Sequence, residues 1–421
     1  MKNNSISYIR TIFSTHKTAF LLYSLIFLLC LSLLPRSGYH VSDMLCWTEW
    51  AKFIYQEGLG NVYKVGTDYL PLYHYILYLY GMIAGSEANI DQYGYLLKIF
   101  SLLFDFAGVI LLYKILIDYV KDTQRALILS LFVLLNIAYL YDTMLWAQVD
   151  AIMTTLVFFA FYFAVKEKVA LTIIFSLLAV NMKLQAIIFL PFISLILFPT
   201  LLREFSIKNL LRWIILAMLV EFIITLPFLL EGDIESVWKV IKNSKGKYPY
   251  ISMNAYNIWY WLPVGKALIV TLDTLQFLGI SYNKWGLLMF ATAYFVSLYP
   301  LIKNAWNLLL KKPVEIIPFE KLLLMGALVP LVFFYFNTQM HERYCHPALI
   351  FVGAFSVLSG RYFPYIIFSI GYMMNMEDVL KAFQWNNYGT VLMSGTVISG
   401  FFALAIISMW MYLYVAKKET I

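Results

Sequence analysis

Long apolar stretches, separated by short polar or basic segments, run along almost the whole chain. A helix that crosses the hydrocarbon core of a bilayer needs roughly 20 mostly apolar residues. Helices are expected because every backbone polar group must be hydrogen-bonded within the segment in lipid. The pattern therefore predicts an all-α, polytopic integral membrane protein with about 12 transmembrane helices, near residues 18–35, 96–119, 126–141, 151–165, 169–182, 184–200, 209–229, 285–302, 321–336, 347–360, 362–374 and 390–414.

The basic residues indicate the direction of these spans. They gather in short loops and at the chain ends on one side, which the positive-inside rule assigns to the cytoplasm. Both termini are then cytoplasmic, and residues 36–95, 142–150, 181–183, 230–284, 337–346 and 375–388 lie outside. The basic residues of the cytoplasmic side are Lys2, Arg10, Lys17, Lys114, Lys121, Arg125, Lys166, Lys168, Arg203, Lys208, Arg212, Lys303, Lys311, Lys312, Arg361, Lys417 and Lys418.

One apolar segment, Leu70–Ala84, does not fit this direction as a span. Counting it would place Lys121 and Arg125 outside. Its His74 stands among several tyrosines, which is typical of a helix at the membrane interface. We therefore expect a helix that lies in or on the external leaflet.

Composition favours a single membrane domain. Hydrophobic residues make up 62% of the chain and charged residues 13%, about half the usual globular share. We expect a core at 18–230, an external loop at 231–284 and additional helices at 285–421. The net charge of +7 follows from the basic loops, so no nucleic-acid partner is expected. The run 18–34 lacks a small-residue cleavage site and is expected to stay as the first helix.

The three cysteines form no disulfide framework and no zinc-binding spacing. Cys30 falls in the first predicted span. Cys46 and Cys345 fall on the same side of the membrane, so one disulfide between them is possible.

Polar residues that could carry chemistry occur in the external segments. Asp43 follows the first span, where a solvated loop acid is the alternative interpretation. Trp146, Gln148 and Asp150 place an aromatic ring beside two polar groups, although Trp is often an interfacial anchor. Lys183 lies between two apolar runs, so it either snorkels to the surface or binds an anion such as a lipid phosphate.

Two later segments add possible ligand contacts. Asn254, Asn257 and Trp259 are the amides and rings that bind sugars, but interfacial loops use the same residues. His341 and Arg343 stand together at the end of a span, where the planar guanidinium suits phosphate oxygens. The zinc pattern HExxH is absent.

Two acids fall within predicted spans. Asp105 shares a helical face with Lys98, and Glu221 lies in the span at 209–229. Such groups usually face a cavity or a partner. We expect structural pairing, between Lys98 and Asp105 or between helices.

In this order, the segments resemble the GT-C superfamily of membrane glycosyltransferases. They look closest to bacterial relatives of the GPI mannosyltransferases and of the dolichyl-phosphate-sugar-dependent transferases, over roughly residues 18–346. Two positions depart from the family pattern: Ala147 stands where Gly is common, and Leu70 where Pro is common. The matching segments are Asp43, D-Y-x-P-L from Asp68 to Leu72, W-x-Q-V-D from Trp146 to Asp150, K-x-Q of Lys183 and Gln185, N-A-x-N-x-W from Asn254 to Trp259, and M-H-E-R-Y from Met340 to Tyr344.

The resemblance implies a hexosyltransferase, such as a mannosyltransferase, of the cell (inner) membrane. A polyprenyl-phosphate-linked sugar would be transferred with inversion to a hydroxyl of a cell-envelope glycan, glycolipid or protein at the external face, without a metal. Asp43 would be the general base, and Arg343, His341 and Lys183 would bind the donor phosphate. The sugar or acceptor would be contacted by Asp68, Tyr69, Trp146, Gln148, Asp150, Gln185, Asn254, Asn257 and Trp259.

Two other functions remain compatible with the sequence. A lipid or polysaccharide transporter or flippase would favour internal repeats and helices broken at mid-membrane depth. No half of the chain echoes the other, and the polar residues gather at the ends of the spans. A polysaccharide polymerase or ligase shares the external sidedness and the cationic site.

Overall fold

The computed structural model describes residues 2–37, 39–231, 234–244, 246–262, 268–386 and 388–415, with side chains from residue 16 onwards. Its regular structure is almost entirely helical, which confirms the all-α prediction. The α-helices are α1 (Lys2–Ser32), α2 (Val41–Glu57), α3 (Pro71–Ala84), α4 (Glu87–Gln92), α5 (Lys98–Val120), α6 (Thr123–Leu134), α7 (Ile137–Tyr141), α8 (Asp150–Val165), α9 (Val169–Met182), α10 (Leu190–Arg203), α11 (Ile207–Leu230), α12 (Ile234–Asn243), α13 (Tyr282–Leu309), α14 (Phe319–Phe336), α15 (Ala348–Ser359), α16 (Phe363–Leu380) and α17 (Gly395–Tyr414).

Short helical turns and two small sheets complete the structure. β1 (Ser252–Met253) pairs in parallel with β4 (Met340–His341), and β2 (Gln276–Phe277) pairs antiparallel with β3 (Ile280–Ser281). The turns are η1 (Leu59–Val65), η2 (Gly94–Leu97), η3 (Asp142–Trp146), η4 (Leu184–Phe189), η5 (Ile258–Trp261) and η7 (Val391–Met393).

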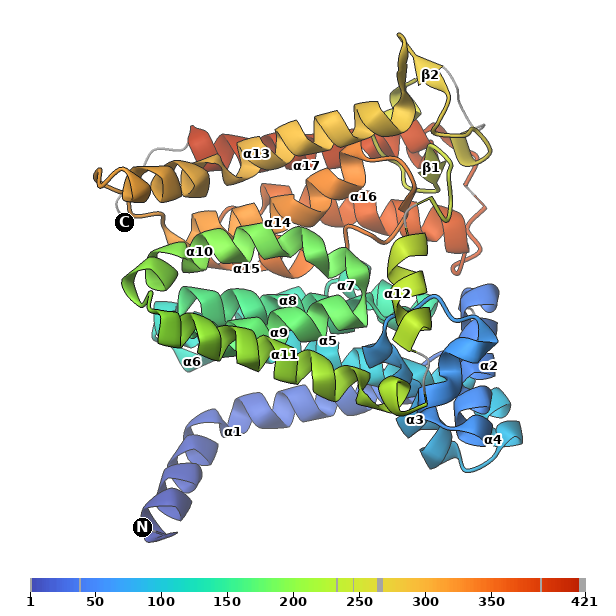
Figure 1. Ribbon diagram of the computed structural model, residues 1–421, viewed down its shortest axis with the longest axis horizontal. Coiled ribbons are helices and arrows are strands. Elements are labelled where there is room, and N and C mark those ends of the chain that lie inside the picture. Colours follow the sequence, from blue (N-terminus) through green and yellow to red (C-terminus); the bar gives the residue numbers. More distant parts are fainter. Residues whose placement is uncertain are drawn as a thin grey trace.

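The long helices run side by side, and the short elements gather at one end of the bundle (Figure 1). This end, built from α2, α3, α4, α12 and β1, is called the α2–α3 end below. The start of α1 and the end of α17 lie toward the opposite end. The basic side chains of Lys2, Arg10, Lys417 and Lys418 lie outside the described residues.

Among the described residues, six helices are long and apolar enough to cross a membrane. They are Gly94–Val120, Leu184–Arg203, Ile207–Leu230, Tyr282–Leu309, Phe319–Phe336 and Gly395–Tyr414. A bent pair, α6 with α7 and η3, brings the number to seven if it counts as one span. Four apolar helices are shorter, at His16–Ser32, Asp150–Val165, Val169–Met182 and Ala348–Ser359. The chain is therefore a membrane-embedded helical protein.

The core lies where α14 and α15 pack against α8. Leu328 and Phe351 are completely buried there. Gly326 of α14 permits the close approach, because a Cβ atom at this position would lie 2.4 Å from the Phe351 ring.

The span predicted at 126–141 is two helices bent by 53°. Asn136 stands at the bend and caps α7, because its side-chain oxygen accepts from the N–H groups of Ala138 at 2.8 Å and Tyr139 at 3.3 Å. The helical path then continues through η3 to Trp146. The turn predicted at 142–150 is therefore shorter and covers residues 147–149.

The helix predicted at Leu70–Ala84 is present as α3. Pro71 begins it, as expected for a residue without an N–H group. α3 packs on α2, and Tyr75 donates to the carbonyl of Ile224 in α11 at 2.9 Å. Its position relative to the bilayer stays a prediction.

The predicted pair between Lys98 and Asp105 is wrong. The Lys98 ammonium donates instead to the carbonyl groups of Pro35 at 3.0 Å and Met144 at 2.8 Å. Lys98 is the first residue of α5. Its ammonium group therefore reaches carbonyl groups of the segments beside the start of this helix, and not Asp105, which lies two turns further along. Interhelical pairing of Glu221 is confirmed, because it accepts from the Asn181 amide at 2.8 Å.

Two other expectations are resolved. α16 continues to Leu380, so the loop predicted at 375–388 starts later. Cys30, Cys46 and Cys345 are all free in this structure, so the possible disulfide is not formed.

Candidate functional site

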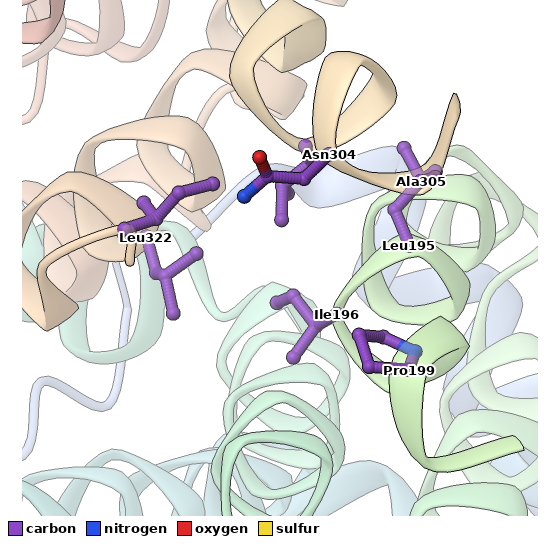
Figure 2. A pocket seen from close by; sticks show the side chains of 8 residues that line it. Leu195, Ile196, Pro199, Asn304, Ala305 and Leu322 are labelled. Carbon is purple, nitrogen blue, oxygen red and sulfur yellow. The ribbon is translucent and has the colours of Figure 1, made fainter. Parts of the chain in front are cut away.

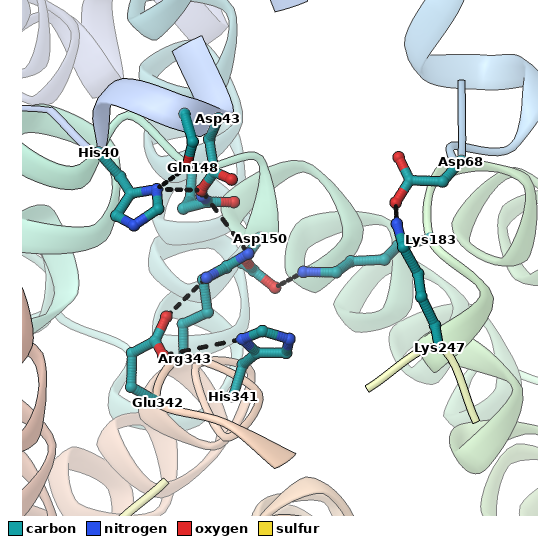
Figure 3. A network of polar contacts seen from close by, with 11 residues as sticks. His40, Asp43, Asp68, Gln148, Asp150, Lys183, Lys247, His341, Glu342 and Arg343 are labelled. Atoms are coloured by element: carbon teal, nitrogen blue, oxygen red, sulfur yellow. Dashed lines mark hydrogen bonds and ion pairs between the residues drawn. The ribbon is translucent and has the colours of Figure 1, made fainter. Parts of the chain in front are cut away.

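Four segments that are distant in sequence meet at the α2–α3 end (Figure 3). Gln148 donates to the Asp43 carboxylate at 2.5 Å, and Lys183 donates to Asp150 at 2.6 Å. The Arg343 guanidinium lies between them, with Nε 3.6 Å from Asp150 and Nη2 3.9 Å from Asp43. The structure thus brings together Asp43, Gln148, Asp150, Lys183 and Arg343 in one network of ion pairs and hydrogen bonds.

The tight turn after η3 positions two of these residues. Ala147 adopts a φ of 69°, and the Gln148 N–H donates to the Asp142 carbonyl at 2.9 Å. The left-handed backbone at position 147 normally favours glycine. The turn directs Gln148 toward Asp43 and starts α8 at Asp150, where the helix N-terminus favours a carboxylate.

Arg343 is surrounded by carboxylates. Its Nη1 donates to Glu342 at 2.6 Å, in addition to the contacts with Asp150 and Asp43. Burial lowers the pKa of Arg343, but these three acids outweigh burial and raise the pKa well above its usual value. Its side chain is 12% exposed, so Arg343 is not completely closed off from the surface of the site. Glu342 was not assigned a role from the sequence.

Asp43 is ionised and partly accessible. Burial raises the pKa of its carboxyl group, but His40, Arg343 and Gln148 together lower the pKa to about 2. His40 places Nδ1 3.3 Å from the carboxylate and stacks its ring on Trp146, with centroids 5.9 Å apart. His40 was not predicted as a site residue, although its position three residues before Asp43 was an available signal.

His341 is part of the site as a neutral group. Burial lowers its pKa to about 3, and the charges of Arg343 and Lys183 act in the same direction. The Tyr248 ring meets it edge-on at 5.0 Å. His341 can therefore offer a hydrogen bond to a ligand, but it adds no positive charge.

Gln185 and Tyr69 lie around the same network. Gln185 donates to the Tyr344 carbonyl at 2.5 Å, and the Lys183 ammonium stands 5.1 Å above the Tyr344 ring. Tyr69 packs against Trp50, with ring centroids 5.6 Å apart. Burial raises the pKa of Tyr69 well above its usual value, although Arg343 acts in the opposite direction, so the phenol is neutral.

Asp68 lies at the other side of Lys183 from Asp43, where it forms an ion pair with Lys247 (Figure 3). Lys247 belongs to the segment between α12 and β1 and stands 5.3 Å above the Tyr248 ring. This ion pair ties the long loop to the first loop across the site. No role was predicted for Lys247.

Three predicted sugar contacts are engaged in holding a loop. Asn257 is completely buried and donates to the carbonyls of Phe334 and Asn337 at 3.2 Å, and the Trp259 indole donates to Asn337 at 3.1 Å. Asn254 has a φ of 65° and forms a backbone bridge with His341. Their contact with a sugar stays a prediction, and their visible role is to fix the loop beside His341.

Several buried polar atoms at the site have no hydrogen-bond partner within the described part of the chain. Buried polar groups in proteins are normally satisfied, so such atoms mark places for water or a ligand. They are Gln148 Oε1, Asp150 Oδ2, Gln185 Oε1, Arg343 Nε and, deeper in the protein, both carboxylate oxygens of Asp142.

A separate apolar cavity of about 150 Å³ lies between α10, α13 and α14 (Figure 2). Leu195, Ile196, Pro199 and Leu322 line it, and Asn304 supplies a polar group. These residues lie toward the helix ends that are remote from Lys183 and Arg343. The cavity therefore offers no acid–base chemistry.

The described residues contain no group of three or more His, Cys, Asp or Glu side chains placed to hold a metal ion. That the reaction needs no metal stays a prediction. The site therefore presents an accessible, ionised carboxylate, Asp43, beside two partly buried cations, Lys183 and Arg343.

No model of a known protein family matches this chain, and no curated protein matches it either. The geometry of the site therefore carries the functional interpretation.

Proposed function

We propose that the chain is a glycosyltransferase that moves a monosaccharide from a polyprenyl-phosphate-linked donor to a hydroxyl acceptor. The supporting observation is that a possible base lies beside possible phosphate-binding groups. Asp43 lies 3.9 Å from Arg343, and Arg343 and Lys183 both contact Asp150. A carboxylate can take a proton from the acceptor, and the two cations can stabilise a phosphate that leaves.

The reaction is a single inverting displacement. The acceptor oxygen attacks the anomeric carbon while its proton passes to Asp43. The bond between that carbon and the phosphate oxygen breaks, and the lipid phosphate leaves beside Arg343 and Lys183. Because Arg343 helps to lower the pKa of Asp43, an anion bound to Arg343 would raise that pKa and make Asp43 a better base.

Asp150 holds the two cations in place for the donor. Its carboxylate is fully buried, bonds the Lys183 ammonium and approaches the Arg343 guanidinium, so it fixes the positions of both charged groups. Around this centre, Asp68, Tyr69, Trp146, Gln148 and Gln185 are the side chains nearest to a sugar or acceptor. Asn254, Asn257 and Trp259 shape the adjoining loop.

The proposed enzyme has a GT-C-like fold of about twelve spans in the cell membrane, with the site outside and both termini in the cytoplasm. The six long helices, the bent pair, the four shorter apolar helices and α16 supply the spans. The core at 18–230 and the helices of 285–421 would flank the loop at 231–284. The position of both chain ends away from the α2–α3 end supports this direction (Figure 1).

Replacement of the proposed base tests this function. Asp43→Asn keeps the size of the side chain but removes its basicity, so sugar transfer should fall about 10²–10⁴-fold. The measurement is mass-spectrometric detection of glycosylated acceptor, made by purified protein from a polyprenyl-phosphate hexose. Asp91→Asn is the matched control, because Asp91 pairs with Lys52 at 2.9 Å on the surface of the same region. Full transfer by Asp43→Asn would remove Asp43 as the base.

One observation favours a lipid or polysaccharide transporter as the second candidate. The bent pair α6–α7 interrupts a span next to the buried acid Asp142. Its carboxylate oxygens have no hydrogen-bond partner among the described residues, although His346 Nδ1 lies 3.9 Å away. Broken helices with buried acids occur in transporters. Lipid-linked sugar that crosses proteoliposomes without being consumed would support this function. The same transfer assay with an oligosaccharide-lipid donor would identify a polymerase or ligase.

A further inference from the structure

His40 forms a dyad with the proposed base. Its Nδ1 atom lies 3.3 Å from Asp43 Oδ2 and 3.1 Å from the Ser42 hydroxyl. The imidazole lies nearly parallel to the Trp146 ring, with 14° between the planes. These contacts fix the ring, while 43% of the side chain is exposed to solvent. In Figure 3, the ring lies beside Asp43 and away from Asp150 and Lys183.

We propose that His40 is a positioning residue that controls Asp43: it passes the acceptor's proton from Asp43 to water, and it blocks Asp43 while it is itself protonated. The inference rests on the proposed function. Asp43 must lose the acceptor's proton before the next sugar can be transferred, and His40 joins this base to solvent.

The proton balance takes three steps. With His40 neutral, the acceptor O–H bond breaks and its proton binds the Asp43 carboxylate. The proton then moves to Nδ1 of His40, which restores the carboxylate and gives an imidazolium. The imidazolium loses one proton to water and returns to the neutral form, which the Ser42 hydroxyl can stabilise by donating to Nδ1.

The charges around His40 favour proton transfer in this direction. Asp43 raises the pKa of His40 above its ordinary value of 6.5, against the effect of partial burial. Glu342 adds to the rise and Arg343 opposes it. The pKa of Asp43 is far lower, at about 2, so a proton shared by the dyad rests on His40.

Chemical modification tests the dyad without any assay of activity. Diethyl pyrocarbonate reacts with neutral imidazole, and of the five histidines, His74 and His346 are completely buried. Mass spectrometry of the proteolytic peptide that contains His40, after modification of the folded protein over pH 5–9, should give a midpoint for His40 above 6.5. Asp43→Asn should lower this midpoint by about one unit or more, because a nearby negative charge is lost. An unchanged midpoint would overturn the dyad.

The pH dependence of transfer tests its role. Wild-type kcat/KM should rise with pH, about tenfold per unit at first, until His40 is neutral. His40→Gln should abolish this rise, whereas His16→Gln at the opposite end should keep it. A rise that persists in His40→Gln would contradict the inference while the proposed function stands. If wild-type protein transfers no sugar, the proposed function fails, and the modification midpoints still decide the dyad.

Discussion

At the scale of single residues, the cations of the site already have carboxylate partners. Arg343 bonds Glu342 and approaches Asp150 and Asp43, and Lys183 bonds Asp150. A donor phosphate must therefore bind those N–H groups of the two cations that have no hydrogen bond to a carboxylate. A guanidinium has five N–H donors. Nη1 of Arg343 bonds Glu342, whereas Nη2 lies 3.9 Å from Asp43, beyond hydrogen-bond distance. This leaves Arg343 able to bind an anion without releasing Glu342.

Arg343→Lys should weaken use of the donor. Lysine keeps the charge but loses the planar fork, and one charge-assisted hydrogen bond corresponds to about 1.5–3 kcal/mol. The KM for polyprenyl-phosphate hexose should rise about tenfold or more, with the KM for the acceptor nearly constant. Arg203→Lys is the control, because Arg203 forms a 2.6 Å ion pair with Glu167 remote from the site. A rise in acceptor KM alone would assign Arg343 to the acceptor.

The sequence motifs predicted the central residues of the site better than they predicted the side chains that form ion pairs around it. Asp43, Gln148, Asp150 and Arg343 meet as the ordered segments implied. Glu342 was missed although it directly precedes its partner Arg343 in the sequence, whereas Lys247 was missed because an ion pair depends on distance in space. Lys247, for example, meets an acid 179 positions away.

At the scale of elements, the loop beside His341 depends on one amide of α16. Asn375 donates to the Asn254 carbonyl at 2.8 Å and accepts from the Tyr256 N–H at 3.0 Å. Next to this clamp, β1 pairs with β4, which contains His341. The sequence predicted the helices because hydrophobic periodicity is local. It could not show a two-residue strand pair or a clamp between segments about 120 residues apart.

Asn375→Ala should reduce both stability and activity. Two buried backbone groups lose their partner, which costs about 1–3 kcal/mol. The loop beside His341 then loosens, so sugar transfer should fall several-fold more than thermal stability alone explains. Asn304→Ala is a close control, because Asn304 clamps Glu315 through two similar bonds, of 2.6 and 3.0 Å, remote from the site. Thermal unfolding and transfer rates of both variants are the measurements. Equal losses of activity would show that the Asn375 clamp has no special relation to the site.

At the scale of the whole molecule, the network of Asp43, Asp150, Lys183 and Arg343 lies at one end of the bundle. α2, α3, α12 and β1 cover this end, and the chain ends lie toward the other (Figure 1). Hydrophobic patterning predicted the long helices and α3, but it did not locate α2, α4 and α12, which lie in the expected external loops. It did not predict the bend at Asn136, because a capping hydrogen bond leaves no break in hydrophobicity.

The direction of the bundle in the membrane can be measured with two cysteines. Trp238 in α12 is 58% exposed near the α2–α3 end, and Ile316 between α13 and α14 is 95% exposed among the predicted cytoplasmic lysines. In a Cys46→Ser background, which removes the exposed native thiol, a membrane-impermeant maleimide should label Trp238→Cys on intact cells. Ile316→Cys should react only after permeabilisation.

The reverse labelling pattern would place Asp43 and Arg343 in the cytoplasm. Nucleotide-linked sugars would then be available to the site, and the argument for a lipid-linked donor would lose its basis. Labelling of both positions from outside would contradict an odd number of crossings between α12 and the segment after α13. The expected pattern requires α13 to cross the membrane, and its 28 residues are sufficient because a span needs roughly 20. The direction of α13 therefore decides which donors can reach the site.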